Sequence, residues 1–208
     1  MLPDQNETPR LKELREKCEA TAPEAIATWP RLSKDDFMFV GIIIVLYSYI
    51  DLNLRRIIDG AEAAGVWKLA KGKASNLRIG DVEDAMFALR KWEPSNEYAL
   101  QEIKRMRGLR NLCAHFAVRR FPEDDAFLFL TRSSRDYKKV TGHEPEIGDL
   151  MTSIVEIAAL KEAIKHIEGL QIWLSHWAPH FEKHFAAGTM PEAQFPFVGE
   201  KAPSTPMD

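Results

Sequence analysis

The stretch that decides the fold is Phe37–Ile50, FMFVGIIIVLYSYI, which is the most apolar run in the chain. Its length of about fourteen residues is short of the roughly 20 that a helix needs to span a bilayer, so we expect a buried core helix. Ser33-Lys34-Asp35-Asp36 precedes it and is typical of a helix N-cap with acidic residues in the first turn. The helix is predicted to run from about Asp35 to Ala64 and to end near Gly65. Because its first half is apolar on nearly all sides, neighbours are expected to cover it completely, at the centre of a bundle or at a subunit interface.

Helical and strand patterns recur on both sides of this run. Residues 11–20 have a weak helical pattern, and helices are predicted over 80–92, over 96–116 and over 147–187, the last as one helix or as two with a kink at Pro179. Ala126–Thr131 is the only convincing strand, and Tyr137–Val140 is its candidate partner in a hairpin that must pack on the helices. The whole pattern predicts an all-α fold, an up-and-down bundle of four to five helices with a small β-hairpin insertion.

The chain divides into three predicted parts. Residues 1–33 form an N-terminal extension, residues 34–187 form the helical domain, and residues 188–208 form a C-terminal tail that contains four prolines. A length of 208 residues with 45% hydrophobic residues suits one domain of ordinary size. The N-terminus is highly charged and lacks an apolar signal core, which predicts a cytoplasmic protein without a membrane partner.

Charge and cysteine content narrow the classes of function. The formal net charge of −3 argues against a general nucleic-acid coat protein, although it allows a local basic site. Cys18 and Cys113 are the only cysteines and form no CxxC pair, so neither a disulfide framework nor a zinc cluster is predicted. A reducing cytosolic setting is the simplest interpretation.

The most informative stretch for function is Arg110-Asn111-Leu112-Cys113-Ala114-His115-Phe116, near the end of the helix predicted over 96–116. An arginine grips a phosphate with a rigid fork of donors, and a histidine moves protons near neutral pH. Phosphate contacts dominate nucleic-acid affinity, and basic residues surround this stretch, so RNA is the first substrate to consider. The residues expected to hold the RNA are Lys104, Arg105, Arg107, Arg119 and Arg120.

Helix geometry sets a condition on such a site. Asn111 and His115 are four positions apart and share one face, whereas Arg110 is rotated from His115 by about 140° on a regular helix. Either the helix is irregular here, or the site is composite and a symmetric dimer brings Arg and His from both chains into one cleft. The plain alternative is a polar helix end, where Arg110 caps carbonyl groups or pairs with a carboxylate.

The stretch resembles the signature of the HEPN domain family, an arginine, commonly followed by a polar residue, and a histidine after a spacer of four to six residues. Here the spacer is Asn111–Ala114, and the helical pattern over about 35–187 also resembles the family's bundle. The resemblance implies metal-independent RNA cleavage in a homodimer with a composite active site and no cofactor. By this resemblance, His115 would transfer the proton of the 2′-hydroxyl or of the leaving oxygen, and Arg110 would bind the scissile phosphate. Asn111 would orient His115 or contact the phosphate.

The resemblance also implies a biological setting. Such domains commonly serve as toxins or anti-phage effectors, which predicts control by an antitoxin or another regulatory protein. Family members that bind RNA or nucleotides without cutting also exist. The rival interpretation is therefore a non-catalytic, HEPN-like regulatory module.

Other polar residues are candidates for supporting roles. Asp51 interrupts the apolar helix, and it either forms a structural salt bridge with Arg55 one turn later or reaches the cleft as an auxiliary residue. Glu102 is a second auxiliary candidate. Three histidines recur every four residues, a spacing that zinc can use, but Pro179 interrupts their helix and no acidic ligand accompanies them. No metal site is therefore predicted at His176, His180 and His184.

Overall fold

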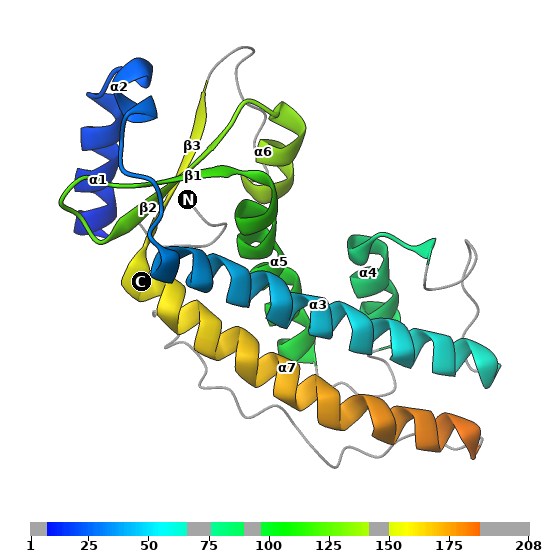
Figure 1. Ribbon diagram of the computed structural model, residues 1–208. Coiled ribbons are helices and arrows are strands. Elements are labelled where there is room, and N and C mark those ends of the chain that lie inside the picture. Colours follow the sequence, from blue (N-terminus) through cyan, green and yellow to red (C-terminus); the bar gives the residue numbers. More distant parts are fainter. Residues whose placement is uncertain (1–7, 66–75, 90–96, 142–149, 188–208) are drawn as a thin grey trace, which may run out of the picture. The chain divides into compact units, whose positions relative to one another are not determined.

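The computed structural model describes residues 8–65, 76–89, 97–141 and 150–187, which are mostly helical (Figure 1). The helices are α1 (Pro9–Glu19), α2 (Pro23–Ala27), α3 (Lys34–Ala63), α4 (Ile79–Leu89), α5 (Glu97–His115), α6 (Ser134–Thr141) and α7 (Ile157–Ala186). The strands are β1 (Ala117–Arg120), β2 (Ala126–Thr131) and β3 (Met151–Glu156). The mostly helical class is confirmed, and α3, α4 and α5 lie close to their predicted bounds. The tail predicted over 188–208 lies outside the described residues.

The chain forms two compact units. The first contains residues 1–47 and 105–167, and the second contains residues 48–104 and 168–208. The helices α3, α5 and α7 contribute residues to both units. The whole sheet and the stretch from Arg110 to His115 belong to the first unit, which therefore positions the candidate site.

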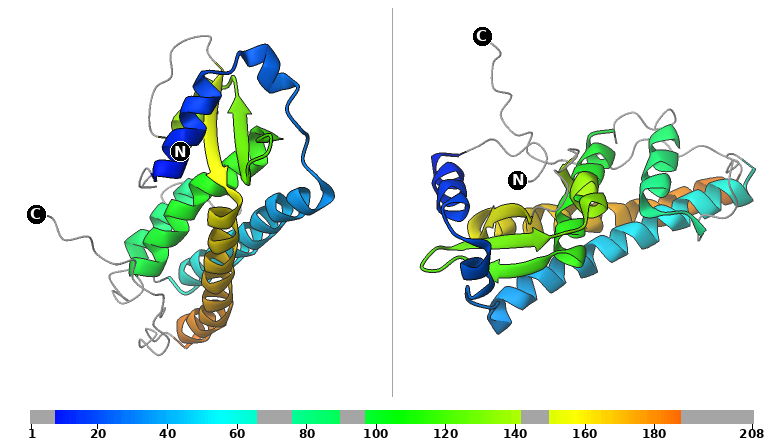
Figure 2. Two further views of the ribbon diagram at one scale, coloured as in Figure 1. Left: turned by 90° about the vertical axis from the view of Figure 1, so that its left-hand side faces the viewer. Right: turned by 90° about the horizontal axis from the view of Figure 1, so that it is seen from above.

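The first unit is built on a three-stranded antiparallel sheet with the order β1-β2-β3. Residues directly opposite each other point to the same face, so Leu128 shares a face with its register partners Arg119 and Ile154. This face packs on α1 and α2, which Figure 2 shows beside the sheet. The buried cluster consists of Leu11, Leu14, Cys18, Ile26, Trp29, Phe121, Ala126, Leu128 and Ile154. Residues 8–33 thus contribute two helices to the core of this unit.

The predicted hairpin is wrong in its second strand. Tyr137–Val140 lies in α6, and β2 pairs with β1 and β3 instead. Ser133 starts α6, because its hydroxyl oxygen accepts a hydrogen bond from the N–H of Asp136 at 3.2 Å. The strand Met151–Glu156 replaces the start of the helix predicted over 147–187. A short apolar run such as MTSIVE fits helix or strand by its pattern, and pairing with β2 decides between them.

The helix α3 has the predicted start and end. The N–H of Asp36 donates to Ser33 Oγ at 3.2 Å, and the N–H of Ser33 donates to Asp36 Oδ2 at 2.9 Å. This reciprocal cap satisfies two backbone donors that a helix start leaves without partners. Gly65, after the last turn, has a φ of 70°, a left-handed conformation that glycine adopts without steric cost.

The described part of the chain does not cover α3 completely, so α3 is not the fully covered central helix of a bundle, and its other predicted setting, a subunit interface, stays a prediction. Ile43 and Ile50 are buried, but large apolar side chains on another side of the helix are more than half exposed. We call these the α3 stripe: Phe37 (62% exposed), Met38 (54%), Val45 (53%), Tyr49 (52%) and Leu52 (53%). A helix that is apolar all round carries no pattern to show which side the rest of its own chain will cover.

The hydropathy of α3 also bears on localisation. It is the one helix of the described residues that is long and apolar enough to cross a membrane, with a mean hydropathy of 1.9 over its most apolar window and 33% of that window buried. Core helices of soluble proteins and signal sequences pass the same test of length and composition. The test is therefore weak evidence, and the cytoplasmic location stays a prediction.

The second unit joins the later part of α3 to α7. Asn53 Nδ2 donates to Ser175 Oγ at 3.3 Å, and Arg56 pairs with Glu182 at 2.9 Å. The buried side chains of α7 include stacked indole rings of Trp173 and Trp177, whose centroids lie 5.1 Å apart. The helix is continuous through Pro179, so the end of the predicted stretch is one helix.

Candidate functional site

The apolar side of α5 is buried, and this burial fixes the helix that carries the candidate site. Met106, Leu109, Leu112 and Phe116 are all buried. The helix runs through His115 without a break, and the N–H of Phe116 donates to the carbonyl of Leu112 at 3.1 Å. An irregular helix is therefore not observed, and the offset of about 140° between Arg110 and His115 stands.

Arg110 and Asn111 are joined to each other. Arg110 Nη1 donates to Asn111 Oδ1 at 3.2 Å, and both side chains are half-buried. No carboxylate pairs with Arg110, and no backbone carbonyl accepts from it, among the residues the structure describes. Because a guanidinium has five N–H donors, most of those of Arg110 are available to an anion. The stretch does lie at the end of α5, but among the described residues Arg110 neither caps backbone carbonyls nor pairs with a carboxylate.

His115 is the last residue of α5 and is exposed. It lies one helical turn after Asn111 on the same face. Within the described ranges, its ring makes no hydrogen bond and no ion pair. An imidazole in this position is accessible both to a ligand and to the solvent with which it exchanges protons.

The auxiliary carboxylates belong to the other unit. Arg55 Nε donates to Asp51 Oδ1 at 2.9 Å and to Oδ2 at 3.1 Å, and Arg55 Nη1 donates to the carbonyl of Leu77 at 2.9 Å. The structural salt bridge that the spacing allowed is thus present. Asp51 and Glu102 lie in the second unit and His115 lies in the first, so a contact of either with His115 stays a prediction.

Ion pairs engage Lys104 and Arg120, which are both predicted RNA-binding residues. Lys104 Nζ lies 2.8 Å from Asp84 Oδ1. Arg120 Nη1 lies 2.7 Å from Oδ1 of the buried Asp36, and its Nη2 lies 2.6 Å from Asp125 Oδ1. These carboxylates offset the charge that a phosphate would meet, and they give Arg120 a structural role.

The remaining predicted RNA-binding residues differ in exposure. Arg105 is exposed, whereas Arg107 and Arg119 are half-buried. Arg119 forms no ion pair with any residue of the described ranges, and it lines a pocket beside β1. Arg120 also lines a pocket, but one that contains three carboxylates, so Arg119 is the member of the predicted set that lies at a concave surface without an ion pair in the described ranges.

The pocket beside β1 was not anticipated from the sequence. It has a volume of about 460 Å³, and its lining includes Ala117, which follows His115 by two residues in the sequence. We call it the α2–sheet pocket, and its lining residues are Pro23, Glu24, Ile26, Ala27, Ala117, Arg119, Leu130, Thr131, Arg132 and Leu150. No periodic pattern links α2 to the ends of β1 and β2, because only the packing of α2 on the sheet brings them together.

The Cys113 thiol and the described histidines and carboxylates are further candidates for reactive groups or metal ligands. Burial raises the pKa of the Cys113 thiol to about 12, so this thiol stays protonated at neutral pH and does not act as a nucleophile. In the described ranges, no three His, Cys, Asp or Glu side chains are placed to hold a metal ion together. In the second unit, the rings of His180 and His184 lie 4.5 Å apart, edge to face.

The chemistry at the end of α5 thus rests on three side chains: a guanidinium without a carboxylate partner among the described residues, an amide that holds it, and an exposed imidazole. This set suits the binding of a phosphate and the transfer of a proton. No protein-family model, no curated protein and no solved structure matches the chain.

Proposed function

We propose that the protein is a metal-independent endoribonuclease of the HEPN type, which cleaves RNA through attack of the 2′-hydroxyl. The observation that supports this proposal is the state of Arg110, whose guanidinium meets no carboxylate among the described residues and is held by Asn111 on the same helix as the exposed His115. A group that binds phosphate and a group that transfers a proton are the minimum that this reaction requires.

The proposed reaction assigns each side chain a step. The 2′-oxygen attacks the neighbouring phosphorus, and the bond from phosphorus to the 5′-oxygen breaks. His115 either accepts the 2′-hydroxyl proton or protonates the leaving 5′-oxygen, and solvent water takes part in the other proton transfer. Arg110 holds the non-bridging oxygens and stabilises the charge that grows on them. Asn111 is a positioning residue, because its Oδ1 fixes the guanidinium. The products are a 2′,3′-cyclic phosphate and a 5′-hydroxyl, and DNA is spared because it lacks the 2′-hydroxyl.

A homodimer with a composite active site is part of the proposal. The regular helix keeps Arg110 and His115 about 140° apart, and a two-fold axis is the simplest way to bring both residue types to one phosphate. The α3 stripe supports self-association, because large exposed apolar surfaces on soluble proteins mark interaction sites. Light scattering at micromolar concentration is expected to give the mass of a dimer for the wild type and that of a monomer for Val45→Glu. A wild-type monomer would contradict the composite site.

The proposed biological role rests on the resemblance to HEPN domains. We propose a cytoplasmic toxin or anti-phage effector that an antitoxin or another regulatory protein controls. Expression of the wild type in a bacterial host is expected to stop growth, and expression of His115→Ala is not. Equal growth with both proteins would argue against a toxin.

One experiment tests the activity itself. Wild-type protein and His115→Ala are incubated with total RNA in EDTA, and the ends of the fragments are analysed. The wild type is expected to leave 2′,3′-cyclic phosphate ends, and loss of His115 is expected to slow cleavage by about 10² to 10⁴-fold. Cleavage by both proteins at one rate would contradict the role of His115. No cleavage by the wild type, together with RNA binding, would instead favour the regulatory module.

A further inference from the structure

The α2–sheet pocket combines an aliphatic lining with cations. The apolar lining comes from Ile26 on α2 and from Leu130 and Leu150 on the sheet side, together with smaller residues. Its volume of about 460 Å³ lies within the range of roughly 300 to 1,000 Å³ that small-molecule sites occupy. Ile26 is buried and belongs to the core cluster on this face of the sheet, so the apolar wall is part of the folded core.

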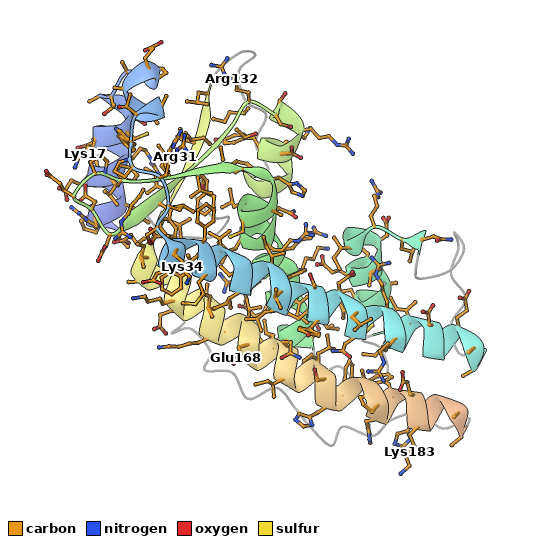
Figure 3. All side chains as sticks on the ribbon, in the orientation of Figure 1. Lys17, Arg31, Lys34, Arg132, Glu168 and Lys183 are labelled. Atoms are coloured by element: carbon orange, nitrogen blue, oxygen red, sulfur yellow. The ribbon has the colours of Figure 1, made fainter. Side chains whose placement is uncertain are left out.

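Two arginines border this apolar space. Arg119 extends from β1, and Arg132, which Figure 3 labels, directly follows β2. Neither forms an ion pair with another residue in the part of the chain that the structure describes. Among the described residues, Glu24 is the one carboxylate in the lining, so their formal charge is positive. The hydroxyl oxygen of Thr131 accepts from the N–H of Ser133 at 3.0 Å, which leaves its hydrogen as a further donor.

The lining excludes some classes of ligand. None of the described lining residues is aromatic, so they offer no ring on which single-stranded RNA bases would stack. The described lining also has one acidic side chain, whereas a divalent cation needs several oxygen ligands. An aliphatic body would match the apolar wall, and an anionic head would match the two guanidinium groups.

We propose that the α2–sheet pocket binds a small amphipathic anion, an aliphatic chain of medium length that ends in a carboxylate or a phosphate. The chain packs against Ile26, Leu130 and Leu150, and the head accepts hydrogen bonds from Arg119 and Arg132. Binding at this pocket requires neither RNA nor cleavage, so the proposal is independent of the proposed ribonuclease activity.

Calorimetric titration of the full chain tests this proposal with four probes. Octanoate and octyl phosphate carry both the chain and the head, octanol lacks the charge, and inorganic phosphate lacks the chain. Both amphipathic anions are expected to bind at one site, at least tenfold more tightly than octanol or inorganic phosphate. The tighter of the two anions identifies the preferred head group. Equal binding of octanol would contradict the role of the arginines, and no binding of either anion below about 1 mM would overturn the proposal.

Variants locate the binding site. Arg119→Gln and Arg132→Gln each remove a charge-assisted hydrogen bond, and each is expected to weaken octanoate binding about tenfold or more. Ala27→Phe keeps both charges and is expected to abolish binding by filling the apolar space. Arg135→Gln is the matched control, because Arg135 is exposed on α6 and lies outside the lining. Circular dichroism verifies that each variant is folded, and equal affinity of all four variants would place the ligand elsewhere.

Discussion

Two arginine-containing regions of the first unit use the same side chain in opposite ways. At the turn between β1 and β2, Arg120 is bound to the buried Asp36 at 2.7 Å and to Asp125 at 2.6 Å. At the end of α5, Arg110 donates to the amide oxygen of Asn111 at 3.2 Å and pairs with no carboxylate among the described residues. The first arginine connects elements of the fold, whereas the second keeps donors that no carboxylate among the described residues engages. Counting basic residues along the sequence does not separate these two roles.

The turn between β1 and β2 gathers contacts from several helices. Asp124 receives hydrogen bonds from Lys17, at 2.6 Å, and from Arg10. Both donors lie on α1, and Figure 3 labels Lys17. Asp36 connects the same strand end to the cap of α3. These contacts hold the turn in place although Glu123 has a φ of 61°, a conformation that costs energy for a residue other than glycine. The end of α5 shows no such network among the described residues.

The largest expected effect comes from mixing two inactive variants of the candidate site. Arg110→Gln and His115→Ala are each expected to lose about 10² to 10³-fold or more of the RNA cleavage rate. In a composite site, their mixed dimer has one intact pair of Arg and His, so an equal mixture is expected to recover about a quarter of the wild-type rate. The measurement is the initial rate of RNA cleavage in EDTA after the variants exchange subunits. Absence of recovery would show that each site takes both residues from one chain.

A smaller effect, on stability, is expected at the turn. Arg120→Gln leaves Asp36 buried without its charged partner, which is expected to lower the free energy of unfolding by about 2 to 3 kcal/mol. Urea denaturation measures this change. Arg119→Gln, one residue earlier in the same strand, is the control, with an expected change within about 0.5 kcal/mol because Arg119 has no ion pair in the described ranges. Equal losses in both variants would show that the ion pair is not the cause.

A still smaller effect concerns pH. Hydrogen bonds from Lys17 and Arg10 hold the pKa of the Asp124 carboxyl below its ordinary value. The stabilisation is therefore complete above the unfolded pKa, near pH 4, and is lost as the pH falls through the lower folded pKa. Because Lys17 and Arg10 are partly exposed, it is expected to amount to less than about 1 kcal/mol. Unfolding free energies of wild type and Asp124→Asn should differ by a constant amount above pH 5 and converge below pH 4. A difference that grows below pH 4 would contradict the assignment.

The smallest effect on RNA cleavage is expected at Cys113, although the burial of its thiol has a large effect on chemical labelling. Burial raises the pKa of its thiol to about 12, so labelling of the native protein with iodoacetamide at pH 7.5 is expected to be about a thousandfold slower than labelling of the unfolded chain. Peptide mass spectrometry measures the label at this position. Cys113→Ala is expected to cleave RNA at the wild-type rate, and rapid native labelling would contradict the burial of this side chain.

The sequence predicted the elements that carry strong local signals. The cap at Ser33, the end of α3 near Gly65 and the bounds of α5 all agree with the structure, because caps and helical periodicity act within a few residues. The strands β1 and β3 were missed, since each is short and becomes a strand only by pairing with β2. The exposed side of α3 was missed for a different reason, as a helix that is apolar all round does not encode which side is covered.

Some features of the candidate site could likewise be predicted from the sequence, and others could not. The order and spacing of Arg110, Asn111 and His115 were evident in the sequence, and the regular helix between them confirms the predicted offset. The sequence did not show which basic side chains are paired with carboxylates, because partners such as Arg120 and Asp36 lie 84 positions apart in the chain. The α2–sheet pocket likewise depends on contacts between segments that are distant in sequence.

The most direct test of the central claim, that Arg110 serves RNA cleavage whereas Arg120 serves the fold, compares two variants in one assay. The initial rate of RNA cleavage is measured in EDTA for the wild type, Arg110→Gln and Arg120→Gln, at a temperature where circular dichroism shows all three folded. We predict that Arg120→Gln cleaves at close to the wild-type rate and that Arg110→Gln is slower by at least about a hundredfold. Equal rates for Arg110→Gln and the wild type, or no cleavage by the wild type, would contradict the claim.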